Sequence, residues 1–324
     1  MAATTSSKLP LITVLGSLNM DLVSYVPHHP LPGETLTSSR FAVSPGGKGA
    51  NQAVACAKLS RSATGSAADA TARIRMLGAV GQDTYGAQLS ANLSRHGVDV
   101  SEVLAPVGLK SGVAIIVVDE PTGQNRIVLS PEANHSLRAE QFAAPASLGD
   151  PLPDLLVMQL EIPLPTVLAA LRVARESGVK VLLNPAPAQE LPAEAYEGLA
   201  HLVVNETEAA TLGGVSESDL DTEAGLEAVG KTFIGRGVQT VIVTLGGRGV
   251  FYMNADGAKG LLPAEKAKVV DTTAAGDTFV GRYALEVVSG SFDIVEAVKK
   301  SNRAAAKTVE RLGAQDSIPW RDEL

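Results

Sequence analysis

The 324-residue sequence has one cysteine, Cys56, and only 4% aromatic residues. A single thiol excludes an intrachain disulfide and any zinc site built from cysteines. No apolar run approaches the roughly 20 residues that a membrane helix requires. Basic residues are the minority charge, 27 against 35 acidic residues, and the net charge is −8. This balance argues against nucleic acid as a partner, because phosphate backbones need a basic face, but a nucleotide needs only a local anion site.

The two ends of the chain favour a cytoplasmic location, with nuclear access open to it. Residues 1–10 are small and polar and lack the apolar centre of a signal peptide. The last four residues, Arg-Asp-Glu-Leu, are close to an ER-retrieval signal, which has no route to act without a signal peptide. Hydrophobic content of 45% and charged content of 19% are ordinary for a soluble α/β enzyme.

Short apolar runs alternate with amphipathic stretches along the chain. The runs predict buried strands at Leu11–Leu15, Ile74–Val80, Leu155–Leu160, Lys180–Leu183, Leu202–Val204 and Thr240–Leu245. The stretches predict helices that include Gly49–Leu59, Tyr85–Arg95, Pro165–Glu176 and Leu220–Phe233. Strand and helix in alternation predict a mostly parallel sheet with helices on both faces, whose ligands lie outside the carboxyl ends of the strands.

Two regions, Leu22–Val43 and Ser111–Ser130, break this alternation and are typical of extended hairpins, the second with a turn at Pro121–Gly123. A third, Ser62–Ala72, is of low complexity and predicts a surface loop.

The segment Asp271-Thr-Thr-Ala-Ala-Gly-Asp-Thr-Phe279 leads into an apolar helical pattern. Ala274, Ala275 and Gly276 therefore stand at a predicted helix N-terminus, where unpaired amides and the helix dipole attract an anion. An acid beside bound phosphate needs a reason, and removal of a proton from an attacking hydroxyl supplies one for Asp277. The segment alone equally allows Asp277 to be an early-helix carboxylate that complements the dipole.

The stretch Gly225-Leu-Glu-Ala-Val-Gly-Lys-Thr232 fits the letters of a phosphate-binding P-loop. A P-loop needs a strand before it and a helix after it, whereas the preceding residues here are acidic and polar. Leu226, Val229 and Phe233 are spaced as one face of a helix, so we interpret this stretch as a helix and not as a nucleotide site.

The Asp271–Phe279 segment resembles the carboxyl-terminal signature of the ribokinase-like sugar kinases, the PfkB carbohydrate kinase family. Eight further segments resemble motifs of that family, in the family's order: Gly16-Ser-Leu-Asn-Met-Asp21, Pro32-Gly-Glu-Thr35, Gly46-Gly-Lys-Gly-Ala-Asn-Gln-Ala53, Met158-Gln-Leu-Glu161, Asn184-Pro-Ala-Pro-Ala188, Asn205-Glu-Thr-Glu208, Thr244-Leu-Gly-Gly-Arg-Gly249 and Gly313-Ala-Gln-Asp-Ser-Ile-Pro-Trp320. The resemblance covers Leu11 to Trp320.

The resemblance implies a single α/β catalytic domain over residues 1–324: a three-layer sandwich with a mostly parallel central sheet. It also implies a small β-sheet lid, inserted at about 20–45 and 111–131, through which two copies form a homodimer. The implied activity is ATP-dependent phosphorylation of the 5-hydroxyl of D-ribose, with ATP, Mg²⁺ and K⁺ as cofactors and no nucleic-acid or membrane partner.

The resemblance also implies site residues. Asp277 would be the general base, with the backbone amides of Ala274, Ala275, Gly276 and Asp277 as an anion hole. The sugar would be held by Asn19, Asp21, Gly47, Lys48, Asn51 and Glu161, with Gly46-Gly47 as a lid hinge. The nucleotide would contact Asn205, Thr244, Leu245, Gly246, Gly247, Arg248, Gly249, Gly276 and Asn302.

The implied metal sites are two. Glu208 would reach Mg²⁺ through water, while Asn205 and Glu208 could equally be a helix capping box. A monovalent cation would be bound by Asp271, Thr273, Thr308, Arg311, Gly313 and Ser317, mostly through main-chain carbonyls. The alternatives left open are the same chemistry on fructose, deoxyribose or a nucleoside, and a sugar sensor without catalysis; the intact Asp277 segment argues against the sensor.

Overall fold

The computed structural model of the chain describes residues 9–66 and 69–324. The argument against a signal peptide concerns residues 1–10, of which residues 1–8 lie outside the described residues. Residues 67 and 68 of the predicted Ser62–Ala72 loop lie outside them as well. The part of that loop that is described contains a turn in which Gly65 N donates to Ser62 O over 3.1 Å. Within the described residues, no helix is long and apolar enough to cross a bilayer.

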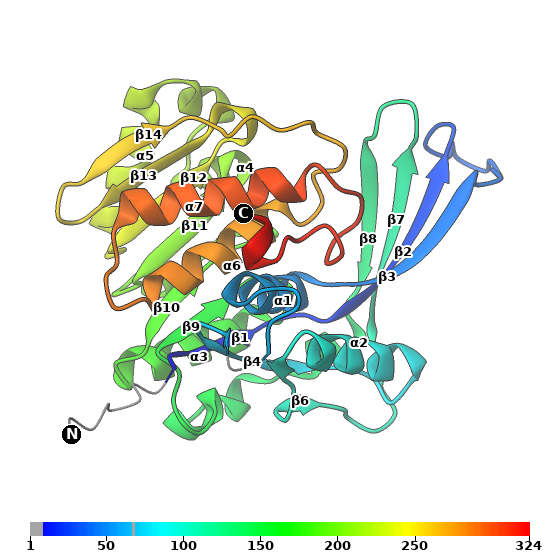
Figure 1. The fold of residues 1–324 in the computed structure, drawn as a ribbon, viewed down its shortest axis with the longest axis horizontal. Helices are drawn as coiled ribbons and strands as arrows, with labels where there is room; N and C mark the ends of the chain where they lie inside the picture. Colours follow the sequence, from blue (N-terminus) through cyan, green and yellow to red (C-terminus); the bar gives the residue numbers. More distant parts are fainter. Residues whose placement is uncertain (1–8, 67–68) are drawn as a thin grey trace.

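A ten-stranded sheet forms the centre of the molecule (Figure 1). Its strands are β1 (Leu11–Leu15), β4 (Arg73–Ala79), β5 (Val98–Asp99), β6 (Val103–Leu104), β9 (Leu155–Met158), β10 (Lys180–Leu183), β11 (His201–Asn205), β12 (Thr240–Thr244), β13 (Val250–Asn254) and β14 (Lys259–Leu262). The order is β14-β13-β12-β11-β10-β9-β1-β4-β5, with β6 also paired to β4. Only the pairs made by β13 are antiparallel, so the predicted mostly parallel sheet is confirmed.

Seven helices surround this sheet in the described part of the chain: α1 (Lys48–Ser60), α2 (Thr84–Arg95), α3 (Leu164–Glu176), α4 (Glu206–Gly213), α5 (Glu223–Gly235), α6 (Ala275–Val287) and α7 (Ile294–Thr308). Side chains alternate along each strand, and they divide the core in two. Leu156 and Met158 pack with α3, α4 and α5, whereas Leu155 and Val157 pack with α1, α2, α6 and α7. The fold is therefore the expected three-layer sandwich.

A second sheet of four strands stands off the sandwich (Figure 1). Its strands are β2 (Asn19–Val26), β3 (Arg40–Gly46), β7 (Gly112–Asp119) and β8 (Asn125–Ser130), in the order β3-β2-β7-β8. The two predicted hairpin regions supply all four strands. The turn predicted at Pro121–Gly123 joins β7 to β8, and Gly123 N donates to Asp119 O over 2.7 Å.

One predicted helix is wrong at its start. The expected helix from Leu220 is interrupted, because Leu220 belongs to a short 3-10 helix, Glu217–Asp221, and α5 begins only at Glu223. The Thr222 side chain accepts from Gly225 N over 3.1 Å and so starts a new helix there. The P-loop-like letters Gly225–Thr232 lie inside α5, and Lys231 pairs with Glu227 over 2.7 Å, so the interpretation of this stretch as a helix is confirmed.

Candidate active site

Polar side chains gather where the parallel strands end. Glu161 follows β9, Asn184 follows β10, and Asn205 ends β11. The expectation that Asn19 and Asp21 form one extended pair is confirmed, since both lie in β2 and both side chains are buried, at 3% and 8% exposed. The four-stranded sheet thus presents two polar residues toward the carboxyl edge of the large sheet.

Asp277 lies in the first turn of α6, as the sequence predicted. The turn before it is tight: Ala274 adopts a left-handed conformation with φ 60°, which is uncommon for a residue with a Cβ. Gly276 has open space beside it, because an added Cβ would meet nothing within 4 Å. A ligand can therefore approach the backbone at this helix start.

The four amides expected to form an anion hole are not all equivalent. Ala275 N already donates to Thr272 O over 3.3 Å. Gly276 and Asp277 occupy the next two positions of the helix, where amides have no carbonyl four residues earlier within the helix. The amide of Ala275 is thus already used in the turn, whereas the amides of Ala274, Gly276 and Asp277 remain for an anion.

Two amide side chains from α1 hold both oxygens of the Asp277 carboxylate. Asn51 Nδ2 donates to Oδ2 over 3.0 Å, and Gln52 Nε2 donates to Oδ1 over 2.9 Å. Gln52 also donates to Asn184 Oδ1 over 3.0 Å. Sequence reasoning placed Asn51 on the sugar and missed Gln52, although Gln52 stands beside Asn51 in the quoted motif. The carboxylate is thus fixed in place with 8% of Asp277 exposed.

Glu161 ties the start of the small sheet to the start of α1. Its Oε2 accepts from Ser17 Oγ over 2.6 Å, from Lys48 N over 3.1 Å and from Asn19 Nδ2 over 3.4 Å. Three of the predicted sugar residues are therefore in one hydrogen-bonded group, and Ser17 is an addition to it.

Asn134 is a further residue that the sequence did not reveal. It is 1% exposed, its Oδ1 accepts from Leu18 N over 2.9 Å, and its Nδ2 donates to Asn19 Oδ1 over 2.8 Å. This orients the Asn19 amide with Nδ2 toward Glu161. No motif marks Asn134, which is 115 residues from Asn19 along the chain.

The charged groups of this site shift the pKa values of their neighbours. Burial, reinforced by the neighbouring carboxylates of Glu161 and Asp277, raises the pKa of Asp21 to about 7. Burial alone would lower the pKa of Lys48, but Asp277, Glu161 and Glu208 outweigh it and raise that pKa. Lys48 is therefore a permanent cation among carboxylates, suited to hold an additional anionic group.

Gly47 is fixed by a close approach of backbone to backbone. Its φ is 86°, and an added Cβ would lie 2.7 Å from Asn19 N and 3.0 Å from Ser17 O. Any larger residue would press on the segment that enters β2. Gly47 therefore packs against the chain as well as bordering the site, and a Gly47→Val variant is expected to disturb the fold.

Asn205 and Glu208 form a capping box at the start of α4. Glu208 N donates to Asn205 Oδ1 over 2.8 Å, and Asn205 N donates to Glu208 Oε2 over 2.9 Å. Burial raises the pKa of Glu208, which is 6% exposed. Each oxygen of Glu208 keeps a lone pair beyond this cap, so the box does not exclude a water-mediated contact with Mg²⁺.

The Thr244–Gly249 loop follows β12 as a 3-10 turn, Gly246–Arg248. Leu245 is 2% exposed and points into the core, so only its backbone can serve a ligand. The Arg248 guanidinium pairs with Glu206, lies 3.5 Å from Asp221 Oδ1 and donates to Leu220 O over 3.0 Å. This network ties the Arg248 side chain to α4 and to the 3-10 helix Glu217–Asp221, so only the backbone of Arg248 is left for a nucleotide. The turn leaves Gly246 and Gly247 exposed.

A further predicted nucleotide residue, Asn302 on α7, donates to Pro263 O over 2.8 Å. It therefore anchors the segment that follows β14, and its side-chain oxygen remains for a ligand.

The predicted monovalent-cation residues come from three segments. Asp271 Oδ1 accepts from Thr273 N over 2.9 Å, and its Oδ2 accepts from Gly313 N over 2.9 Å, so these segments meet. The side chains of Thr308 and Arg311 face elsewhere, Thr308 toward Thr278 and Arg311 toward Glu323. Each of these two residues can still offer its main-chain carbonyl oxygen to a cation. Ser317 Oγ donates to Ala314 O over 2.7 Å, which leaves its lone pairs free.

Within the described residues, no group of three or more His, Cys, Asp or Glu is placed to hold a metal.

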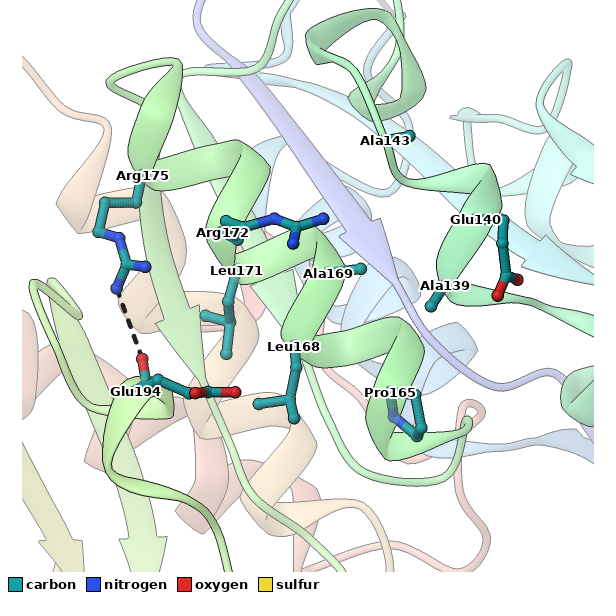
Figure 2. A pocket seen from close by; sticks show the side chains of 10 residues that line it. All are labelled: Ala139, Glu140, Ala143, Pro165, Leu168, Ala169, Leu171, Arg172, Arg175 and Glu194. Carbon is teal, nitrogen blue, oxygen red and sulfur yellow. Dashed lines mark hydrogen bonds between the residues drawn. The ribbon is translucent and has the colours of Figure 1, made fainter.

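A hollow of about 530 Å³ lies apart from this site (Figure 2). None of the predicted site residues lines it; its walls come from α3 and short 3-10 turns, with Leu168, Leu171, Arg172 and Glu194 among them. Arg175 turns toward Glu194, whose main-chain oxygen it reaches over 3.5 Å. The four charged side chains of the hollow, Glu140, Arg172, Arg175 and Glu194, are all exposed, so it does not compete with the strand-end site as a catalytic centre.

Comparison with known proteins agrees with this geometry. The sequence profile of the pfkB family carbohydrate kinases matches residues 9–321. Ribokinase of Schizosaccharomyces pombe is 41% identical over 311 residues, covering 95% of this chain and 94% of that protein. The structure of Thermotoga maritima ribokinase is similar, with a TM-score of 0.81 and 38% identity over 97% of both chains. Arabidopsis thaliana ribokinase, complexed with ribose and ATP, has a TM-score of 0.83 and 26% identity, again over 97% of both chains.

Proposed function

The chain belongs to the pfkB family of carbohydrate kinases, and we propose that it transfers the γ-phosphoryl group of ATP to the 5-hydroxyl of D-ribose. The observation that carries this proposal is Asp277: a buried carboxylate, held at both oxygens, beside the amides of a helix start. Several relatives similar over nearly the whole chain are ribokinases, one of them complexed with ribose and ATP, which supports ribose as the acceptor and ATP as the donor. Deoxyribokinase of Salmonella typhi is also similar over 95% of this chain, so deoxyribose is the alternative acceptor.

In the proposed reaction, the Asp277 carboxylate takes the proton of the 5-hydroxyl as that oxygen attacks the γ-phosphorus. The bond from the γ-phosphorus to the bridging oxygen breaks, and its electron pair leaves with ADP. Amides of Ala274, Gly276 and Asp277, with the α6 dipole, stabilise the charge on the transferred group. Asn19, Asp21, Lys48 and Glu161 hold the sugar hydroxyls, and Asn51 holds both the base and the sugar.

We assign the nucleotide to the strand ends of β11 and β12 and to α7. Asn205 lies near the phosphates, and the exposed backbone of Gly246 and Gly247 lies against the nucleoside, with Asn302 at its far side. Glu208 would hold Mg²⁺ through water, and the ion would supply neutralisation of the phosphate charge. The burial of Glu208 beside Lys48 and Asp277 supports a place close to the transferred phosphate.

We assign a K⁺ site to Asp271, Thr273, Gly313 and Ser317, with carbonyls of Thr308 and Arg311. The contacts of Asp271 with Thr273 N and Gly313 N support it, because they already join the segment before the anion site to the carboxyl-terminal loop. Turnover is expected to be faster in K⁺ than in Na⁺ or Tris alone; equal rates in all three would remove the assignment.

We assign the four-stranded sheet as a lid over the sugar and as the contact between two copies of the chain. One face carries Asp21; the opposite face carries a cross-strand row of Val43, Leu22, Ile115 and Val128. Three of these are largely exposed, Val43 at 46%, Ile115 at 47% and Val128 at 63%. An exposed apolar row of this kind favours pairing with a second copy. Light scattering should give twice the monomer mass, and Ile115→Lys should reduce it; a monomeric parent would refute this contact.

Two assays test the activity. Initial rates on ribose, 2-deoxyribose, fructose and a nucleoside, with ATP and Mg²⁺, should give the highest kcat/KM for ribose, and NMR should place the phosphate on carbon 5. A tenfold preference for another acceptor would overturn the proposed substrate. Asp277→Asn should lower kcat by about 10²- to 10⁴-fold while calorimetry still detects sugar binding. Near-normal turnover would reject Asp277 as the base.

A further inference from the structure

Asn51 is itself held by a glutamine that the proposed function leaves unused. Gln315 Nε2 donates to Asn51 Oδ1 over 3.0 Å, and Gln315 Oε1 accepts from Asn92 Nδ2, on α2, over 2.5 Å. Asn92 Oδ1 accepts in turn from Arg95 over 3.1 Å. A chain of hydrogen bonds therefore runs from Arg95 through three amides to the Asp277 carboxylate, with every donor pointing toward Asp277.

The groups at both ends of this chain require its hydrogen bonds to run from Arg95 toward Asp277. A guanidinium has donors and no acceptor, so Arg95 requires Asn92 Oδ1 to face it and leaves Nδ2 for Gln315. A carboxylate only accepts, so Asp277 requires Asn51 to present Nδ2. The orientation of an isolated amide is ambiguous, but these two fixed ends settle all three. The amide-bearing residues are buried, with Asn92 and Asn51 6% exposed and Gln315 4% exposed.

A second, shorter chain has the same polarity. Gln159 Nε2 donates to Gln52 Oε1 over 2.6 Å, and Gln52 donates to Asp277. Gln159 is fully buried, and its Oε1 has no partner among the described residues. Turning this amide over would set two oxygens against each other at Gln52. The unpaired acceptor is thus the consequence of keeping the donor aimed along the chain to Asp277.

We propose that Gln315 is a positioning residue for the base. It holds Asn51 with Nδ2 toward Asp277 and so keeps the carboxylate turned to the proton it removes; this inference rests on the proposed role of Asp277. Without the Gln315 donor, Asn51 can rotate by half a turn and set Oδ1 against the carboxylate, where two acceptors repel. The carboxylate would then pivot on Gln52 alone.

Three variants at two links test the chain. Gln315→Met removes both hydrogen bonds at similar volume, and Gln315→Glu keeps an acceptor for Asn92 but gives Asn51 no donor when ionised. Asn92→Asp, on another element, removes the donor to Gln315 Oε1. Gln82→Met is the matched control, because the Gln82 amide donates to a loop carbonyl, Ala105 O, and touches no member of the chain.

Each variant is assayed for kcat, for KM of ATP and for the folded fraction at the assay temperature, with kcat expressed per folded molecule. We expect kcat to fall about ten- to a hundredfold at both links, most in Gln315→Glu, since small displacements of a catalytic group have effects of that order. KM for ATP should stay within about threefold, and the Gln82 control should match the parent.

The outcomes separate the two proposals. If folded Gln315→Met and Asn92→Asp keep kcat within about twofold of the parent while Asp277→Asn is inactive, the positioning role is wrong and the proposed function stands. If Asp277→Asn keeps its turnover, the base itself is wrong. If kcat per folded molecule is higher in Gln315→Glu than in Gln315→Met, the proposed hydrogen-bond donation from Gln315 to Asn51 is wrong. Loss of folding at Gln315 leaves Asn92→Asp to decide the matter in the same assay.

Discussion

Replacing Asp21 by asparagine is expected to stabilise the ligand-free protein and to impair sugar turnover. Asp21 is 8% exposed, and none of the hydrogen bonds of the described residues reaches its carboxylate. Burial first, and then the charges of Glu161 and Asp277, raises its pKa from 3.8 to about 7. Above pH 7 the protein therefore keeps the Asp21 carboxylate ionised in surroundings that disfavour the charge. Such a carboxylate is available to accept hydrogen bonds from sugar hydroxyls.

The sign of the effect follows from proton linkage. Between pH 3.8 and about 7 the folded protein holds a proton that the unfolded chain has lost, so stability falls as pH rises through this window. The full penalty is present above pH 7. A difference of 7 − 3.8 pH units corresponds to about 4 kcal/mol at about 1.36 kcal/mol per unit, which is an upper limit. Asparagine still buries an amide, so a gain of about 1–3 kcal/mol at pH 8 is expected.

Thermal melts of parent and variant at pH 4 and pH 8 measure this gain. The variant should melt higher than the parent at pH 8, with little difference at pH 4. Asp256→Asn, in the exposed turn after β13, is the control and should shift neither melt. In the same preparations KM for the sugar should rise about 10- to 100-fold, because a charged hydrogen-bond acceptor is lost. The parent's affinity for sugar should weaken below pH 7, and the variant's should not.

Two results would refute this reasoning. If the variant is no more stable than the parent at pH 8, the carboxylate is not destabilised by its surroundings. If the stability gain is the same at pH 4 and pH 8, it does not come from ionisation of Asp21.

Two further substitutions test the reading of single segments. Lys231→Ala should leave kcat within a few-fold of the parent, because Lys231 lies on α5 and pairs with Glu227; a collapse of ATP turnover in the folded variant would restore the P-loop interpretation. Gly47→Val should lower the melting temperature and abolish sugar turnover, since φ 86° costs about 1–3 kcal/mol and the side chain would also meet Asn19 N. Gly257→Val has a φ of 94° with nothing within 4 Å, so it should show the conformational cost alone with normal kinetics; equal kinetic loss in both, or in neither, would contradict the close approach at Gly47.

Local patterns in the sequence determined much of the scaffold. The strands β1 and β10 begin and end where the apolar runs do, and the start of α6 was set by small residues followed by an acid. The Asn205–Glu208 capping box could be anticipated because its partners are three residues apart on one helical turn. Interactions between residues close in sequence depend on backbone periodicity and on helix capping, and both can be inferred from a short stretch of sequence.

Contacts between distant segments were decided only by the tertiary structure. Asn134 reaches Asn19 across 115 residues, and Gln315 reaches Asn51 across 264, and neither pairing has a local signal. The same holds for Asp21, which nothing in the sequence distinguishes from any other aspartate. Its pKa is raised because folding removes water from the carboxyl group and brings Glu161 and Asp277 near it. The segment Gly225–Thr232 shows that a local signal can also mislead, since its sequence fits a phosphate-binding loop and yet it lies within α5. Burial and electrostatics depend on what the fold places around a side chain, and so the chemistry of the site was determined by assembly of the two sheets.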